Sequence, residues 1–385
     1  MNTKILAINN RDKYRQVYEL LYSELFSNKY SIGQKIPNAV DLAKKYGVSR
    51  PTIARAQEQL EREGILVRKQ GAGTFVSKNI PVVNGRLGVL FPGFKVEPLE
   101  FKGFTPLFGQ VISNIANSSH GTEYVLLMNE LPFGFDENES IEQAVDVSLK
   151  LIKMQIRGVF FVPFSFSLQN NTVNCQIVNR FRDAGIHVVL IDRDICEYPD
   201  RSFCDLVEID NCRAGYKLTE HLMNVGCRKI DFITDPNPAS TVEKRVKGYL
   251  DALEKNGIAP DLSRIHNFPL TQPDPEQEYN LIKKIIDGTD ADAFICATDC
   301  LASVFMRNLK KMEIRIPEQK KVVGFDGDPF AEYLPVPLTT VRQPTEAIGK
   351  EAFRLMKSRI ENPQMPIQTV TLEAELIVRR SCGAK

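Results

Sequence analysis

The sequence lacks the features that would place the protein in a membrane or in an oxidising compartment. No apolar run reaches the roughly 18 residues needed to cross a bilayer, and the N-terminus has no secretory signal pattern. The eight cysteines contain no Cys-x-x-Cys pair, and only four histidines are available to help bind a metal. We therefore expect a cytoplasmic protein with reduced cysteines, no membrane contact, no bound metal and no cofactor.

Catalytic signatures are also missing. There is no Gly-x-x-x-x-Gly-Lys phosphate loop, no Gly-x-Ser-x-Gly elbow and no His-Glu-x-x-His pair. The four histidines are scattered, with His187 in an apolar strand and His221 on a packed helix. The sequence therefore predicts a binding protein rather than an enzyme.

Length and charge indicate more than one folding unit. A chain of 385 residues usually divides into two or three domains. Residues 1–78 carry 14 Lys and Arg against 7 Asp and Glu, a formal charge of +7, whereas the remainder carries 35 against 41, or −6. A small basic segment on a large acidic remainder is typical of a module that binds a polyanion, attached to a domain that does not.

The first 77 residues show the pattern of a helix-turn-helix followed by a hairpin. Apolar spacing predicts helices over residues 14–29, 39–46 and 49–63, with Ser49 as the cap of the third and Pro51 in its first turn. Residues 64–76 then suggest two short strands around a basic, glycine-bearing turn, the wing of a winged helix. The residues expected to be buried are Val17, Leu20, Leu21, Leu25, Phe26, Val40, Leu42, Ala43, Ile53, Ala56 and Leu60.

This region resembles the GntR family of regulators. The family pattern of Leu-Pro, Gly-Val-Ser-Arg-x-Thr, Leu-x-x-Glu-Gly and Gly-x-Gly-Thr-x-Val is followed at residues 36–37, 47–52, 60–64 and 71–76. The resemblance implies that the third helix and the wing bind operator DNA, the helix through its N-terminal amides and positive dipole. The residues expected at the DNA are Ser49, Arg50, Thr52, Arg55, Lys69, Gly71 and Gly73.

Two positions depart from that pattern. Ala39-Val40 replaces an acidic-basic pair, and Ala54 stands where arginine is common, with Arg55 one place further on. The loss of cationic contacts should weaken phosphate attraction and change which bases are read, without removing the fold. Each arginine of this region also has a second interpretation, as a solvated surface charge.

Residues 78–86 are predicted to be a linker, and residues 87–385 a second, larger domain. The strands expected in it cover residues 87–91, 124–128, 158–162, 187–191, 229–233, 293–296 and 321–325. The helices expected between them cover residues 107–118, 141–153, 175–184, 213–225, 241–256, 275–287 and 299–311. Continuous apolar strands that alternate with helices predict an α/β fold of two parallel sheets flanked by helices.

The larger domain resembles the LacI-type effector domain, which is itself similar to periplasmic sugar-binding proteins. The motifs that carry the resemblance occur in order, at residues 210–211, 221–222, 226–230, 245–249, 322–326 and 337–343. Cys227 replaces a histidine of that pattern, and Thr298 an asparagine. The resemblance implies a two-lobed domain whose chain crosses between lobes three times, and we place the crossings near residues 193–208, 326–329 and 340–344.

By motif position, Asp192, Arg245 and Asp326 are expected to bind the effector. A guanidinium fork donates to vicinal hydroxyls while carboxylates accept, so the set suits a monosaccharide or a sugar phosphate. The second-choice contacts are Arg193, Thr298, Asp299 and Gln343. The aspartates have a second interpretation, as helix caps or salt-bridge partners. Four aromatic residues are expected either to stack on a sugar ring or to belong to the core: Phe94, Phe101, Phe104 and Phe108.

These observations predict a sequence-specific transcription regulator whose operator affinity is controlled by a sugar-like effector. Helix-turn-helix proteins usually pair on palindromic sites, so we expect a homodimer. Release of operator by the sugar is the expected sign, which would make the protein a repressor of sugar-use genes. Two alternatives stay open: a regulator whose C-terminal domain only dimerises, and a sugar-binding protein with no regulatory role.

Overall fold

The chain divides into two units. The computed structural model describes residues 10–26, 30, 33–77, 85–91, 106–128, 137–164, 168–196, 199–269 and 275–384. The first unit holds residues 1–84 with 121–124, and the second holds 85–120 with 125–385. Of the predicted linker, residues 78–84 lie outside the described residues, while Gly85 and Arg86 already belong to a strand. The second domain therefore begins two residues earlier than predicted.

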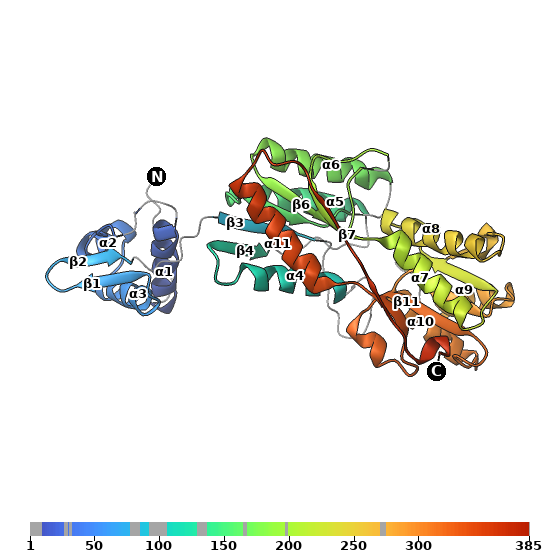
Figure 1. The fold of residues 1–385 in the computed structure, drawn as a ribbon. Helices are drawn as coiled ribbons and strands as arrows, with labels where there is room; N and C mark the ends of the chain where they lie inside the picture. The colour runs from blue at the N-terminus through green and yellow to red at the C-terminus, as the bar shows by residue number, and fades with distance from the viewer. Residues whose placement is uncertain are drawn as a thin grey trace. The chain divides into compact units, whose positions relative to one another are not determined.

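The first unit is a three-helix arrangement with a two-stranded hairpin (Figure 1). Its elements are α1 (Asn10–Phe26), α2 (Ala39–Tyr46), α3 (Arg50–Arg62), β1 (Leu66–Lys69) and β2 (Gly73–Val76), the two strands pairing antiparallel. The Asn38 side chain caps α2 by accepting from the backbone N–H groups of Val40 and Asp41. Gly47 ends this helix at a φ of 68°, which glycine adopts without strain.

The core of this unit follows the predicted helix faces with two exceptions. It is built from Val17, Leu21, Leu25, Leu42, Ile53, Ala56 and Leu60, with Ala43 packed against it. Leu20 and Val40, predicted to be buried, are 39% and 45% exposed. Leu20 lies to one side of the helix face formed by Val17, Leu21 and Leu25, against which Tyr14 and Tyr18 also pack, so its side chain is turned towards solvent. The side chain of Phe26 lies outside the described residues.

The second unit contains two six-stranded sheets, which we call the first and second lobes. The first sheet has the order β13-β7-β6-β5-β3-β4 and the second the order β14-β12-β11-β10-β8-β9. The strands of the first are β3 (Gly85–Leu90), β4 (Tyr124–Met128), β5 (Gly158–Phe161), β6 (His187–Ile191), β7 (Asp205–Ile209) and β13 (Thr369–Leu372). Those of the second are β8 (Ile230–Thr234), β9 (Ile265–Asn267), β10 (Ala293–Cys296), β11 (Lys321–Asp326), β12 (Thr339–Arg342) and β14 (Glu375–Ile377).

Helices cover both sheets (Figure 1). In the first lobe, α4 (Pro106–Ser119) packs with α11 (Thr345–Glu361), and α5 (Glu137–Lys153) with α6 (Leu168–Asp183). In the second lobe, α7 (Asn211–Asn224) packs with α8 (Ser240–Lys255), and α9 (Pro275–Asp287) with α10 (Asp299–Lys311). Three short 3-10 turns complete it: η1 (Leu262–Arg264), η2 (Pro329–Glu332) and η3 (Arg380–Cys382). The predicted α/β fold of two helix-flanked, largely parallel sheets is confirmed.

The chain passes between the lobes at three places, only one of which was predicted. It leaves the first sheet after β7, returns between β12 and α11, and leaves again between β13 and β14. Residues 340–344 include the second passage. The predicted crossing at 193–208 is wrong because β7 still belongs to the first sheet, and the one at 326–329 is wrong because β11 and β12 are neighbours in the second sheet.

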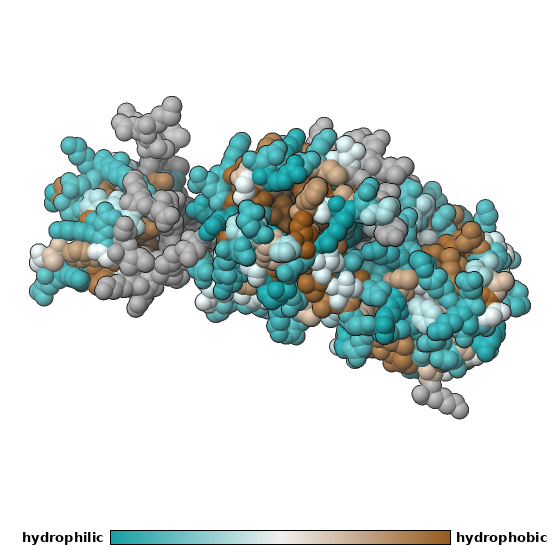
Figure 2. All heavy atoms as spheres, turned by 45° about the horizontal axis from the view of Figure 1, so that its top comes forward, coloured by the Kyte–Doolittle hydropathy of each residue, from teal (hydrophilic) through white to brown (hydrophobic). Residues whose placement is uncertain are grey.

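The face of the molecule shown in Figure 2 is mainly polar where the structure describes it. On the face shown in Figure 2, hydrophilic residues cover most of the area and hydrophobic ones form separate patches. Among the described helices, none has the length and apolar character required to span a membrane.

Candidate DNA interface and effector site

The N-terminal end of α3 carries most of the residues predicted at the DNA. Ser49 precedes the helix in an extended conformation, and its hydroxyl hydrogen-bonds the Thr52 hydroxyl at 2.8 Å rather than a backbone N–H. Arg50, the first helical residue, is exposed, and Pro51 occupies the first turn as predicted. Arg50 forms no hydrogen bond or ion pair within the described part of the chain. Its guanidinium is therefore available to a phosphate, next to the backbone amides of a helix N-terminus.

Arg55 and Lys69 are exposed, but each also contacts an aromatic ring of the same unit. The Arg55 guanidinium lies 4.7 Å from the centre of the Tyr14 ring, and the Lys69 ammonium 5.0 Å from that of Phe75. Cation–π contacts of this kind limit the motion of a long side chain while leaving its charge facing solvent. Both residues can thus present charge at lower entropic cost than a free side chain would.

The two glycines of the wing, Gly71 and Gly73, differ in their surroundings. Gly71 has a φ of 73°, and a Cβ there would meet no atom within 4 Å, so its surroundings are open. Gly73 has a φ of 113°, and a Cβ would lie 2.6 Å from Cε of Lys35. Because the end of the Lys35 side chain can move aside, the positive φ is what favours glycine at both positions, and the open surroundings of Gly71 leave room for a DNA backbone.

The predicted effector residues of the first lobe lie directly after β6. Asp192 has a φ of 78°, and its Oδ2 atom is 3.4 Å from Nη2 of Arg193. Both side chains are about nine-tenths buried, and Nε of Arg193 has no hydrogen-bond partner among the described residues. Burial lowers the pKa of Arg193, Asp192 partly offsets this, and the nearby charge of Arg245 lowers it further.

Arg245 and Asp326 form a buried pair in the second lobe. Nη2 of Arg245 lies 3.3 Å from Oδ1 of Asp326, its Nη1 donates to the Ala297 carbonyl at 2.6 Å, and its Nε donates to Oδ1 of Asn211 at 2.9 Å. The guanidinium also stacks over the Phe325 ring at 3.7 Å. These contacts fix the fork in one orientation.

Gln343 completes the group by donating from Nε2 to Oδ1 of Asp326 at 2.9 Å. Burial raises the pKa of Asp326 to about 6; Arg245 and Gln343 oppose this rise, and the charge of Asp192 adds to it. Asp192 therefore acts electrostatically on Asp326 from the other lobe. We call Asp192, Arg193, Arg245, Asp326 and Gln343 the acid–arginine cluster.

The two remaining second-choice residues, Thr298 and Asp299, have hydrogen-bond partners within the second lobe. The Thr298 hydroxyl accepts from the backbone N–H of Leu301 at 3.1 Å, so Thr298, and not Asp299, caps α10. Asp299 is completely buried and accepts from the Gly327 and Asp328 amides at 2.9 and 2.8 Å and from the Thr340 hydroxyl at 2.6 Å. Its carboxylate thereby supports the loop after Asp326.

Sequence reasoning overlooked one member of the site. Asn211 is buried and holds Nε of Arg245. The Asp-Asn motif at residues 210–211 marked the position, but no role was assigned to it. Of the four aromatic candidates, Phe94, Phe101 and Phe104 lie outside the described residues, and Phe108 packs edge-on against Phe91 at 5.9 Å.

Comparison with known proteins finds a matching family for a segment of each unit. Residues 13–76 match the family described as bacterial regulatory proteins, gntR family, and residues 219–382 match the periplasmic binding protein-like domain. An arabinose metabolism transcriptional repressor of Halalkalibacterium halodurans is 26% identical over 382 residues, which cover 96% of each chain. It is a transcription regulator rather than an enzyme, as the sequence predicts for this chain.

Solved structures support the fold. A LacI family regulator from Enterococcus faecium with bound ribose has a TM-score of 0.61 at 22% identity, covering 77% of this chain and 98% of its own. A complex of the transcriptional regulator CelR with cellobiose has the same TM-score and identity, covering 90% and 100%. The chain thus joins a segment that matches the gntR family of bacterial regulatory proteins to a segment that matches the periplasmic binding protein-like domain.

Proposed function

We propose that this protein is a transcription regulator that binds operator DNA through residues 1–77 and a sugar through the domain that begins at β3. The observation that carries the proposal is the acid–arginine cluster, in which residues of both lobes lie within electrostatic reach of one another. A ligand held there would touch both lobes and could alter their arrangement. We place the protein in the cytoplasm, where its operator is.

The chemistry of the cluster favours an uncharged sugar. Each guanidinium already faces a carboxylate, Arg193 at Asp192 and Arg245 at Asp326, so the site has no surplus positive charge for a phosphate. The unpartnered Nε of Arg193 is a donor that a hydroxyl or ring oxygen could satisfy. Of the similar proteins, one has ribose bound, one is a cellobiose complex and one is a repressor of arabinose metabolism. Two of these three sugars are pentoses, so pentoses are the first candidates.

A thermal-shift and calorimetric screen tests this assignment. L-arabinose, D-ribose, D-xylose and cellobiose would be compared with the 5-phosphates of the same pentoses. We expect one neutral sugar to raise the melting temperature and its phosphate to have no effect. Binding of a phosphate alone would contradict the charge argument, and silence across the whole panel with intact DNA binding would favour a domain that only dimerises.

We propose that sugar binding regulates transcription by releasing the protein from its operator DNA. Coupling between two sites is typically about 1–3 kcal/mol, so the sugar should lower operator affinity by roughly 5–150-fold. An operator selected from a random DNA pool, followed by fluorescence anisotropy with and without sugar, measures the factor. Tighter DNA binding with sugar would identify a co-repressor instead.

A homodimer is proposed through the second lobe. A cavity of about 630 Å³ opens there between the end of α10 and the loop before β12, lined by apolar side chains that include Met306, Ile314 and Leu334. Tyr333, beside it, is 82% exposed. A large exposed aromatic next to an apolar groove is typical of a protein–protein contact.

A further inference from the structure

A cavity of about 480 Å³ lies within the first lobe. Its walls come from α6, from the chain between the start of β6 and the start of β7, and from the end of α11 with the chain that follows it. In Figure 1, α6, β6 and β7 belong to one lobe. No residue of the acid–arginine cluster is among the described residues that line this cavity. A ligand there would therefore contact the first lobe alone, in a space of the size usual for small-molecule sites.

The inner wall of the cavity is apolar. Val178, Ile186, Val188 and Ile195 line it, and each is 6–8% exposed. All four belong to the hydrophobic core of the first lobe, so the cavity reaches that core. A wall of branched aliphatic side chains favours the apolar body of a ligand.

Three thiols and an imidazole also line the cavity, from Cys175, Cys196, Cys204 and His187. Burial raises the pKa of Cys196 and that of Cys204, the latter to about 12, and it lowers the pKa of His187. These last three groups are therefore uncharged near neutral pH. They add polarisable surface to the wall and no charge.

One buried hydroxyl of the wall has no partner. Ser202 lines the cavity and is 6% exposed, and its Oγ has no hydrogen-bond partner among the described residues. The hydroxyl opposes the rise in the pKa of Cys204, but a thiol is only a weak donor and acceptor. Because a buried hydroxyl without a hydrogen bond is unfavourable, an oxygen of a ligand is its expected partner.

The charged side chains of the wall leave a surplus of positive charge. Arg201 is exposed and forms no hydrogen bond or ion pair within the described part of the chain. Arg182 has only a loose pair with the exposed Asp183, at 3.9 Å. Arg359, by contrast, donates to both oxygens of Asp205, at 2.9 and 2.8 Å, so these two charges cancel. Two guanidinium groups therefore remain for an anion.

We propose that this cavity binds a small organic acid. The apolar body of the acid lies against the core side chains, its carboxylate lies at Arg201 and Arg182, and the Ser202 hydroxyl donates to one of its oxygens. In the acid–arginine cluster each guanidinium already faces a carboxylate, so the two sites select ligands of different charge. The inference does not depend on the proposed sugar site.

Thermal-shift measurements and calorimetry with the full-length protein test the ligand class. The probes are benzoate, octanoate and 4-methyl-2-oxopentanoate, with benzamide and octanamide as neutral counterparts and citrate as an anion without an apolar body. At least one of the three acids should bind, and the amides and citrate should bind about tenfold more weakly or not at all. Amides that bind as tightly as the acids, binding of citrate alone, or no binding by any of the acids would overturn the proposal.

Alkylation by N-ethylmaleimide, read by mass spectrometry, tests the place of binding. Cys175 and Cys196 are half-buried and line the cavity, whereas Cys212 is half-buried on α7 in the second lobe. The acid, at ten times its dissociation constant, should slow alkylation of Cys175 and Cys196 about tenfold and leave Cys212 unchanged. Binding of the acid with no protection of either cysteine would contradict this location.

Two variants of the wall test the polar contacts. Arg201→Ala should weaken binding of the acid about tenfold and leave sugar binding unchanged. Arg354→Ala is the matched control, because this exposed arginine of α11 does not line the cavity. Ser202→Ala should weaken binding about threefold, while the ligand-free variant should melt no lower than the wild type, since the lost hydroxyl has no partner there.

Three outcomes with these proteins would contradict the assignment. Equal losses in Arg201→Ala and Arg354→Ala would mean that net charge, and not the place of Arg201, attracts the acid. A lower melting temperature of ligand-free Ser202→Ala would mean that the hydroxyl serves the fold. Arg245→Lys, in the acid–arginine cluster, should bind the acid as the wild type does, and a loss there would place the acid in the proposed sugar site.

Discussion

Two of the predicted effector residues, Asp192 and Asp326, have a strained backbone conformation. Asp192 and Asp326 both adopt positive φ, at 78° and 115°, a conformation that costs an aspartate roughly 1–2 kcal/mol. Asp192 directly follows β6 and Asp326 is the last residue of β11, so in each lobe the strain occurs at the end of a strand, where the chain turns. Backbone strain of this kind concentrates at binding sites because the surrounding structure offsets it.

Arg245→Lys should separate sugar binding from DNA binding. Lysine keeps the positive charge opposite Asp326 but cannot donate to Asn211, Ala297 and a ligand with one planar fork. We expect sugar affinity to fall by about tenfold or more while operator affinity stays within about twofold, by calorimetry and anisotropy. Arg354→Lys, an exposed arginine on α11, is the control and should change neither. Equal losses in both assays would mean that the substitution disturbs the fold.

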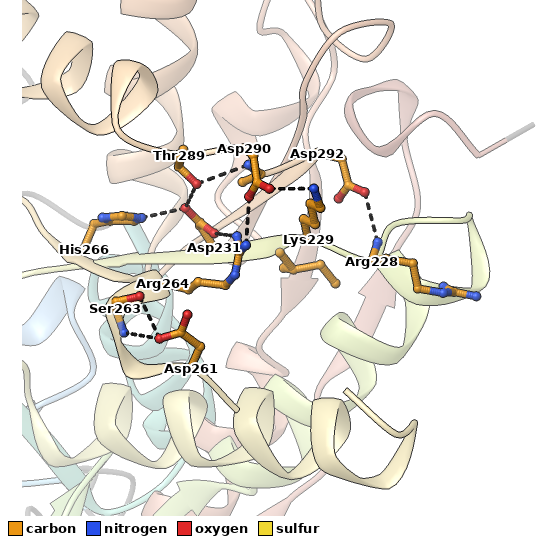
Figure 3. A network of polar contacts seen from close by, with 12 residues as sticks. Arg228, Lys229, Asp231, Asp261, Ser263, Arg264, His266, Thr289, Asp290 and Asp292 are labelled. Carbon is orange, nitrogen blue, oxygen red and sulfur yellow. Dashed lines mark hydrogen bonds and ion pairs between the residues drawn. The ribbon is translucent and has the colours of Figure 1, made fainter. Parts of the chain in front are cut away.

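A second buried group, at the far edge of the second sheet, predicts a pH dependence of stability. Asp231 is completely buried and accepts from His266 at 2.6 Å, Thr289 at 2.7 Å and Arg264 at 2.8 Å (Figure 3). Burial alone would raise its pKa, but the three hydrogen bonds outweigh burial and hold the pKa below 3.8. A depressed pKa in the folded state stabilises the fold above the unfolded-state value, and this stability is lost as the pH falls below 3.8.

Asp231→Asn should therefore lower the free energy of unfolding by about 2 kcal/mol near neutral pH. The difference from the wild type should narrow as urea unfolding is repeated from about pH 5 down to about pH 3. Asp287→Asn, in an exposed pair with Lys283 at 2.7 Å, should have little effect at any pH. If the difference in the free energy of unfolding between the wild type and Asp231→Asn stays constant over this pH range, the charge of Asp231 is not the cause of the stabilisation.

At the scale of elements, most amphipathic helices and continuous apolar strands could be predicted from the sequence, and five short strands could not. The strands at 124–128, 187–191 and 293–296 and the helices α9 and α10 begin and end where predicted. Strands β7, β9, β12, β13 and β14, of three to five residues, were missed because such runs carry too little periodicity. Helix α11 was also missed, although Ile348, Ala352 and Met356 recur at helical spacing and are buried.

The recognition element α3 gives a prediction of its own. Arg50→Ala removes an exposed charge at the N-terminal end of the helix and should weaken operator binding by about tenfold, with the slope of log affinity against log salt reduced by about 0.9. Sugar binding should be unchanged. Arg62→Ala, which removes a charge paired with Glu58 at 2.7 Å in the last turn of the same helix, is the control. If both variants lose equal affinity, net charge matters and the place of Arg50 does not.

At the scale of the whole molecule, the second unit joins its lobes by three chain passages. Three passages make independent movement of the lobes unfavourable, so they are expected to rotate about a shared hinge. A ligand can shift that rotation only by the difference in its affinity for the two arrangements. The acid–arginine cluster, with donors and acceptors from both lobes, can supply such a difference.

The proposed dimer is tested by Tyr333→Asp, examined by sedimentation velocity over a range of concentrations. A carboxylate beside the apolar groove of the second lobe should raise the dimer dissociation constant by about tenfold or more. Phe203→Asp is the matched control, because this phenylalanine is 81% exposed but belongs to the first lobe. Dissociation by the control and not by Tyr333→Asp would move the interface to the first lobe.

The sequence by itself determined the local features: the helix-turn-helix with its wing, the alternation of strands and helices, and the residue types of the effector site. These follow from periodicity, turn residues and motif spacing, which act over a few positions. The tertiary structure alone decided that Thr298 caps a helix, that Asp299 supports a loop, that Asn211 holds Arg245, and where the chain passes between lobes. The physical reason is that a buried polar side chain needs a hydrogen-bond partner on a neighbouring strand or helix. The order of the strands determines which strand or helix is the neighbour, and no local sequence pattern encodes that order.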